Sequence, residues 1–252
     1  LKRTIIKNPT IIPQQCTYHF QSYNSNVCQL RIDFDMTLAQ PTIPDGNNGL
    51  ESVTCLMDKF SVGNTVICGT NTKQHRMLSY FTQQYTNLPD LRTLFLRPNY
   101  YADVDLLAPP GCLQYFTKRQ GTFESFNFNM GKGPYMSNMR YGICFKRTPL
   151  DHKIRFSSET FQIGAASDTS NFVDIDCHDI VATPKRSNDY LTIPESVLES
   201  DIEMFGNYYC GTSLRDDITY APPGPFVIYF NSDNLFSTLV PEVGFKINYV
   251  IQ

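Results

Sequence analysis

The stretch Cys28-Gln-Leu-Arg-Ile-Asp-Phe34 alternates polar and apolar side chains with a period of two. Successive side chains of a β-strand point to opposite faces, so Leu30, Ile32 and Phe34 would share one face. The opposite face would carry only polar side chains. This pattern predicts a strand that is buried on one face and solvated on the other.

The same alternation recurs along the chain, and each segment is bounded by Gly, Pro, Asn, Asp or Ser. The further segments are residues 59–66, 121–128, 189–193, 225–230 and 244–251. Helix signals are weak: only residues 193–204 have a start signal for a helical turn or two, and a structured loop fits them equally well. Many short strands separated by turns predict an all-β sandwich or jelly roll.

Composition favours a folded protein and excludes two classes of partner. Of 252 residues, 41% are hydrophobic and 18% are charged, and 15 Tyr and 18 Phe supply ample core material. A net charge of −3 without a run of Lys or Arg argues against nucleic acid, which is bound by clustered cations. No apolar stretch approaches the roughly 18 residues that a membrane span needs.

A domain boundary is predicted at Ala108-Pro-Pro-Gly111, where two prolines and a glycine separate two strand-rich halves. Each half has four cysteines, and in each the last one is followed by glycine, as Cys68-Gly69 and Cys210-Gly211. We therefore expect two modules, residues 1–107 and 108–252, that are divergent copies of one unit. A linker this short and stiff should restrict their mutual orientation.

The eight cysteines form an even set of four sequential pairs, in which no two cysteines lie closer than 12 residues. This spacing lacks the close pairs that a zinc site requires, so it favours disulfides. Disulfides of this number indicate an oxidising compartment, and we expect a secreted, extracellular protein.

Motifs for catalysis are not found. The four histidines are scattered singly, and neither a zinc-protease motif nor a Gly-x-Ser-x-Gly elbow occurs. Gly131-Lys-Gly-Pro134 lacks the spacing of a phosphate loop, so a tight turn explains it better. We predict that the protein is not an enzyme, although a metal site or triad without a linear motif would leave that alternative open.

Several stretches resemble the CUB family, and most closely the tandem CUB-like secreted proteins of arthropods. In the first half they are Ile6-Lys-Asn-Pro9, Cys16-Thr-Tyr-His-Phe20, Cys28 to Phe34, Cys55-Leu-Met-Asp-Lys-Phe60 and Cys68-Gly-Thr-Asn71. In the second half they are Ala108-Pro-Pro-Gly-Cys112, Gly121-Thr-Phe-Glu-Ser-Phe126, Tyr141-Gly-Ile-Cys144, Tyr209-Cys-Gly211, Pro225-Phe-Val-Ile-Tyr-Phe230 and Gly244-Phe-Lys-Ile-Asn-Tyr249.

The resemblance implies a fold, a disulfide pattern and a function. It implies two consecutive CUB-type antiparallel β-sandwich (jelly-roll) modules. It implies four bridges, namely Cys16 to Cys28, Cys55 to Cys68, Cys112 to Cys144 and Cys177 to Cys210. The function it implies is non-enzymatic, adhesion-type binding of an extracellular protein partner. The alternative is a self-associating structural or carbohydrate-binding protein of the extracellular matrix.

The resemblance also implies a tentative calcium site in the second module, since many CUB domains hold calcium with three acidic side chains. Asp189 and Asp233 match two of the family's ligand positions. The third position has no acid, so Asp174 or Asp176 would have to substitute, and Asp179 competes with Asp189. Calcium takes six to eight oxygen ligands. The alternative is that these acids merely end strands and cap turns.

In the first module Asp58 lies at a matching position, but Gln40 replaces the acid expected there. We expect no calcium in that module. No other cofactor is predicted.

Overall fold

The computed structural model describes residues 4–6, 16–19, 27–45, 51–63, 65–79, 84–85, 93–100, 107–164, 172–173, 177, 189–199, 201–214, 217–236 and 242–252. Within these residues the chain consists of strands and turns, with one short 3-10 helix, η2 (Asn129–Gly131). The prediction of an all-β fold is confirmed. In the same part of the chain, no helix has the length and apolar character needed to cross a membrane.

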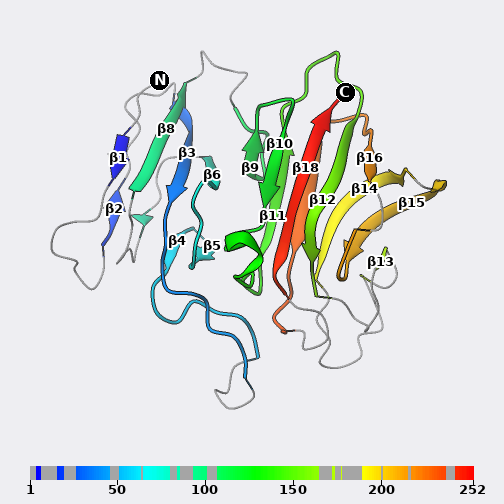
Figure 1. Ribbon diagram of the computed structural model, residues 1–252. Helices are drawn as coiled ribbons and strands as arrows, with labels where there is room; N and C mark the ends of the chain where they lie inside the picture. The colour runs from blue at the N-terminus through cyan, green and yellow to red at the C-terminus, as the bar shows by residue number, and fades with distance from the viewer. Residues whose placement is uncertain are drawn as a thin grey trace.

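The N-terminal part contains a four-stranded antiparallel sheet and two small strand pairs (Figure 1). The sheet runs in the order β1 (Thr4–Ile6), β8 (Thr93–Tyr100), β3 (Val27–Asp35) and β6 (His75–Ser79). The pairs are β2 (Tyr18–His19) with β7 (Gln84–Tyr85), and β4 (Phe60–Val62) with β5 (Thr65–Ile67).

The sequence pattern located β3 correctly, because Leu30, Ile32 and Phe34 are all buried. The single strand predicted over residues 59–66 is instead the β4–β5 hairpin. Gly63, between the two strands, has a φ of +53°, a left-handed conformation that glycine adopts without steric penalty. The alternation of side chains continues through such a turn, so periodicity alone does not detect it.

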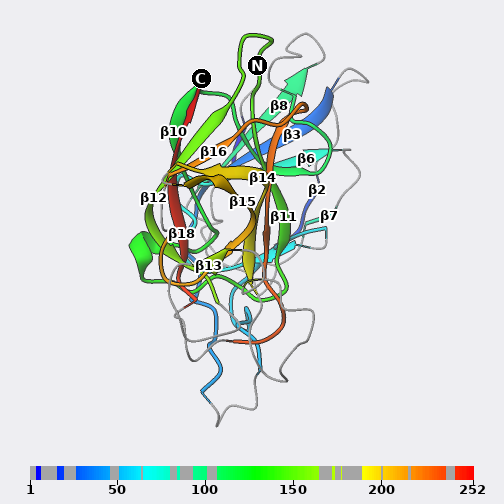
Figure 2. The same ribbon diagram turned by 90° about the vertical axis from the view of Figure 1, so that its right-hand side faces the viewer.

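The C-terminal part forms one curled sheet whose main path runs β10-β18-β12-β16-β14-β17-β11-β9. The strands on that path are β9 (Cys112–Phe116), β10 (Gln120–Glu124), β11 (Arg140–Phe145), β12 (Ile154–Gln162), β14 (Tyr190–Leu198), β16 (Ile218–Tyr220), β17 (Phe226–Asn231) and β18 (Gly244–Ile251). Beside β14 lies β15 (Asp201–Cys210), which also pairs with β13 (Phe172–Val173). Figure 2 shows β10, β12 and β18 on one side and β11 on the other, so the sheet closes over its own inner face.

Residues 193–204 belong to the β14–β15 hairpin, so the alternative of a helical turn there is wrong. The register of this hairpin shifts between Thr192 and Ser196, and Pro194 lies within the shift. A bulge accommodates a proline in a strand, because the missing N–H is not required by the ladder at that point. The flanking residues Ile193 and Leu198 are buried, as a strand face requires.

The core is built from aromatic rings and continues across the predicted boundary at residue 108. Phe123 packs edge-on against Phe145 and Phe156, with ring centroids 5.4 and 6.0 Å away. Phe34 of the N-terminal part reaches the same cluster through Phe126, at 6.4 Å. The two parts therefore share one hydrophobic core, while the division into residues 1–107 and 108–252 stays a prediction.

Three predicted disulfides are present: Cys55 to Cys68, Cys112 to Cys144 and Cys177 to Cys210. Among the side chains that the structure describes, Cys16 has no disulfide partner. The side chain of Cys28 lies outside the described residues, so the fourth bridge, Cys16 to Cys28, stays a prediction.

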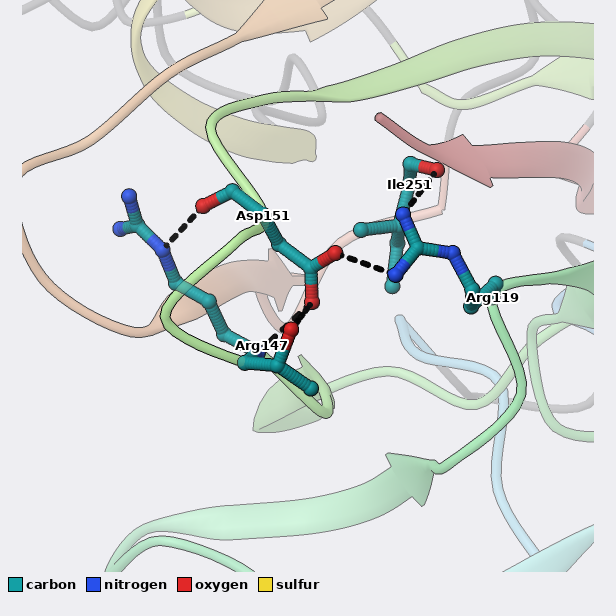
Figure 3. A network of polar contacts seen from close by, with 5 residues as sticks. Arg119, Arg147, Asp151 and Ile251 are labelled. Atoms are coloured by element: carbon teal, nitrogen blue, oxygen red, sulfur yellow. Dashed lines mark hydrogen bonds and ion pairs between the residues drawn. The ribbon is translucent and has the colours of Figure 1, made fainter.

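A buried carboxylate ties together the end of the sandwich at which the chain terminates (Figure 3). The Asp151 carboxylate accepts hydrogen bonds from the Thr148 N–H at 2.7 Å and from the Thr148 hydroxyl at 2.8 Å. It also forms an ion pair with Arg119 at 2.6 Å. Arg147 donates to the Asp151 carbonyl at 3.0 Å. Burial acts to raise the pKa of Asp151, but the Thr148 hydrogen bonds and the Arg119 charge together outweigh it and lower that pKa.

Candidate functional site

Asp189 is the centre of a buried hydrogen-bond network at the opposite end of the C-terminal sheet. It lies just before β14 and is only 1% exposed. Its Oδ1 accepts the backbone N–H of Asp233 at 2.7 Å, and its Oδ2 accepts the Tyr135 hydroxyl at 2.6 Å. The same hydroxyl accepts the N–H of Gly164 at 2.8 Å. One carboxylate thus joins three segments that are far apart in the sequence.

Burial and nearby negative charges keep the Tyr135 hydroxyl protonated, as its hydrogen bond to Asp189 requires. Burial, followed by the negative charges of Asp189 and Glu242, raises the pKa of Tyr135 well above its ordinary value. The phenol therefore stays neutral and keeps the proton that it donates to Asp189. Glu242 is itself buried, and its carbonyl accepts the N–H of Tyr135 at 3.1 Å.

Asp233 closes the turn that follows β17. Its Oδ1 accepts the N–H of Leu235 at 2.7 Å, as in a turn capped by an aspartate. Its carbonyl accepts the N–H of Asn138 at 2.7 Å, and Asn138 has a left-handed φ of +60°. This geometry agrees with the alternative that these acids cap turns.

The structure thus places two of the predicted calcium ligands, Asp189 and Asp233, in contact with each other. Asp174, Asp176 and Asp179 lie outside the described residues. Within the described part of the chain no group of three or more His, Cys, Asp or Glu side chains is arranged to hold a metal ion. Both oxygens of Asp189 already accept hydrogen bonds, so the described residues alone do not make a calcium cage.

In the N-terminal part, Gln40 is exposed and donates to the Thr70 hydroxyl at 3.4 Å, while Asp58 is half-buried. Neither belongs to a group of metal-binding side chains among the residues that the structure describes.

A hollow of about 290 Å³ lies beside this network. Arg140, Tyr190 and Asp233 contribute to its wall. Arg140 is exposed and donates to the Asn231 side chain at 3.0 Å, and the ring of Tyr190 packs edge-on against Tyr208 at 5.1 Å. Neither Arg140 nor Tyr190 was predicted from the sequence. Tyr190 follows Asp189 directly, but Arg140 reaches the hollow only through its pairing with Asn231, which the sequence does not show.

A loop of the N-terminal part is attached next to this hollow. The Val53 N–H donates to the Ser137 hydroxyl at 2.9 Å, and the Ser137 N–H donates to the Val53 carbonyl at 3.1 Å. The bridge from Cys55 to Cys68 holds the same loop. Leu56 and Met57 lie on it, and they are 59% and 77% exposed. Large exposed apolar side chains are therefore carried by a restrained loop, which is attached at Ser137 next to Asn138 in the wall of the hollow.

Comparison with known proteins identifies one family. Residues 109–252 match the family model of the animal CUB domain. Among solved structures, the CUB1-EGF-CUB2 domain of human MASP-1/3 is 12% identical, with a TM-score of 0.35 and coverage of 99% of both chains. The CUB1-EGF-CUB2 domains of rat MASP-1 are 14% identical, with a TM-score of 0.32 and coverage of 98% of this chain and 97% of that one. Likenesses this low support no structural argument. No curated protein matches.

Proposed function

The chain belongs to the animal CUB-domain family, and on that premise we propose that it is a secreted, non-enzymatic protein that acts through protein–protein contacts. CUB domains in general indicate extracellular protein–protein interaction. The observation that supports a binding role here is the restrained surface at the Asp189 end. There, a hollow of the C-terminal sheet and an apolar loop of the N-terminal part lie together.

The residue types on this surface suit a protein partner. Tyrosine, methionine and arginine are enriched at interfaces, and Tyr190, Met57 and Arg140 supply them here. The loop carrying Met57 is restrained by a disulfide and by the Val53–Ser137 hydrogen bonds. Restraint of this kind reduces the conformational entropy that is lost on binding. We therefore assign the partner's contact to this surface.

A capture experiment with matched variants tests this assignment. The tagged protein is used as bait in extracellular fluid from its source, and bound proteins are identified by mass spectrometry. We expect wild-type protein and a Leu150→Asp control to capture the same partner, because Leu150 is an exposed apolar residue on the turn that holds Asp151, at the other end of the sandwich. Arg140→Glu and Met57→Asp should lose that partner while keeping the wild-type melting temperature. Equal capture by all four proteins would exclude this surface as the contact.

Calcium dependence of this end stays a prediction, because the acids that would complete the site, Asp174 and Asp176, lie outside the described residues. If calcium binds, Asp189 and Asp233 would be among its ligands, and its role would be to order the surrounding loops. Scanning calorimetry with calcium and with chelator tests this.

We also propose that residues 1–107 are a second, more divergent module of the same kind. The antiparallel sheet β1-β8-β3-β6 and the hairpin that precedes Cys68-Gly69 support this proposal. A crystal structure of the whole chain tests it. The β2–β7 and β4–β5 pairs should then extend into a second layer facing that sheet, and a single uncovered sheet would contradict the proposal.

A further inference from the structure

Strand β10 lies at one end of the main path of the C-terminal sheet, where its strand partner is β18. Figure 1 shows β10 on the side of that sheet that faces the N-terminal part of the chain. The register pairs Gln120 with Val250 at one end and Glu124 with Lys246 at the other. Along its other side, β10 has no neighbouring strand among the residues that the structure describes.

The hydrogen bonds to β18 show which backbone groups of β10 point to that open side. The Ser125 N–H donates to the Phe245 carbonyl at 3.1 Å, and the Ile251 N–H donates to the Arg119 carbonyl at 2.7 Å. Residues of an antiparallel pair alternate between hydrogen-bonded and non-hydrogen-bonded positions. Every second residue between Arg119 and Ser125 therefore directs its backbone groups away from β18.

The residues at these positions are Gln120, Thr122 and Glu124. The Glu124 carbonyl accepts a weak hydrogen bond from Nε2 of Gln114 at 3.5 Å. The other five N–H and C=O groups of the three residues have no partner within the described part of the chain. A row of unpaired backbone groups at a sheet edge is a template for an added strand.

A second hollow, of about 310 Å³, lies along this edge, and Thr122, Phe123 and Glu124 all line it. Successive side chains of a strand point to opposite faces. Phe123 is buried in the core, whereas Thr122 is exposed. Because residues of both faces line the hollow, it lies at the edge of β10, where an added strand would run.

Another wall of this hollow comes from the N-terminal part and is held in place. It is the turn of residues 72–74, directly before β6. The Lys73 N–H donates to the Phe34 carbonyl at 2.9 Å, and Nε2 of Gln74 donates to the Ser125 carbonyl at 2.8 Å. The second bond fixes the turn to the residue that follows β10. A groove with fixed walls lowers the entropy that is lost on binding.

We propose that this edge binds an extended segment of a partner protein, which joins the C-terminal sheet as a strand beside β10. Alternate residues of a strand repeat at about 6.6 Å, so an extended main chain presents N–H and C=O groups at the spacing of the unpaired groups of β10. A compact small molecule would reach fewer of them. The contact is separate from the one proposed at the Asp189 end.

A proline at the centre of β10 tests strand addition. Thr122→Pro removes an N–H that points away from β18, and a proline is tolerated at such a position of an edge strand. Thr122→Val is the matched control, because it also loses the side-chain hydrogen bond to Asn248 but keeps the N–H. Both variants should keep the wild-type fold by circular dichroism.

The probe is a phage library of random seven-residue peptides, selected on the full chain. Each selected peptide is then synthesised and titrated by fluorescence polarisation. We expect at least one peptide that binds wild type and Thr122→Val equally well and binds Thr122→Pro about tenfold more weakly. The same peptide should slow hydrogen exchange of the Gln120, Thr122 and Glu124 N–H groups in the wild type.

N-methylation of that peptide tests main-chain pairing on the unaltered protein, so it does not depend on the folding of a variant. Methyl groups on every second residue remove the N–H groups from one side of the peptide strand. One alternating set should weaken binding about tenfold, and the other set, which points away from β10, should leave it nearly unchanged.

Three results would overturn the proposal: no peptide with this profile, equal binding to Thr122→Pro and wild type, or equal tolerance of both methylation patterns. Self-association of the wild type that Thr122→Pro abolishes, measured by sedimentation, would assign the edge to a second copy of the chain and overturn it as well. Failure here would leave the contact proposed at the Asp189 end untouched, since Arg140 and Met57 are unaltered in these variants.

Discussion

Replacing Gly69 by alanine should disrupt the tightest contact between the two parts of the chain. Gly69 has a left-handed φ of +72°, and a Cβ added there would lie 1.9 Å from Oδ1 of Asn127. That oxygen accepts the N–H of Thr70 at 2.8 Å, and Nδ2 of the same side chain donates to the Pro134 carbonyl at 2.8 Å. Asn127 is completely buried, so its amide has no room to move without breaking these bonds.

The expected loss of stability has two components. An alanine in the left-handed region is disfavoured by about 1–2 kcal/mol. Displacing the Asn127 amide removes two hydrogen bonds, each worth about 0.5–1.5 kcal/mol. Gly69→Ala should therefore lower the free energy of unfolding by about 2–5 kcal/mol.

Urea denaturation followed by circular dichroism measures this, and two other glycines separate the components. Gly111 has a φ of +85° with nothing within 4 Å of an added Cβ, so Gly111→Ala should show the backbone component alone. Gly224 has neither a left-handed φ nor a close neighbour, so Gly224→Ala should change stability by less than about 0.5 kcal/mol. If Gly69→Ala is no more destabilising than Gly111→Ala, the interlocked packing at Asn127 is refuted.

Two further predictions concern the ends of the C-terminal sandwich. Asp151→Asn should lower the free energy of unfolding by about 1–3 kcal/mol at pH 7. Because the pKa of Asp151 is lowered in the folded state, its contribution is present above the unfolded value of about 3.9 and is lost as the pH falls through the folded value. Denaturation at pH 7 and at low pH checks this, and a difference between variant and wild type that does not shrink in acid would contradict it. Calcium at 100 times its dissociation constant should raise the melting temperature by about 5–10 °C, and Asp189→Asn should abolish the rise. Scanning calorimetry with and without chelator measures the shift, and no shift in millimolar calcium would remove the predicted site.

Some of the strands were predictable from the sequence, because the alternation of side chains is a local property. The segments 225–230 and 244–251 correspond closely to β17 and β18 for this reason. The segment 193–204 was not predictable, since Pro-Glu-Ser after Thr192 has the local features of a helix start. Its pairing across the β14–β15 hairpin decides its conformation, and tertiary context of this kind overrides weak propensity.

The candidate site was predictable only in part. Asp189 and Asp233 were identified from the resemblance, and the structure brings them together across 44 residues. Tyr135 and Gly164, which complete the network, carried no signal, since a tyrosine and a glycine in such positions are common in any sandwich. The contacts between the two parts were equally hidden, because Gln74 meets Ser125 and His75 meets Tyr115 only when the parts pack.

The sequence by itself determined that the chain is an all-β protein built from short, half-buried strands, since side-chain alternation and turn residues are encoded locally. The tertiary structure alone decided that both parts share one core and which polar groups meet at Asp189 and between the two parts. Those contacts join residues that are distant along the chain, and their partners are selected by packing and by the need to pair buried polar groups.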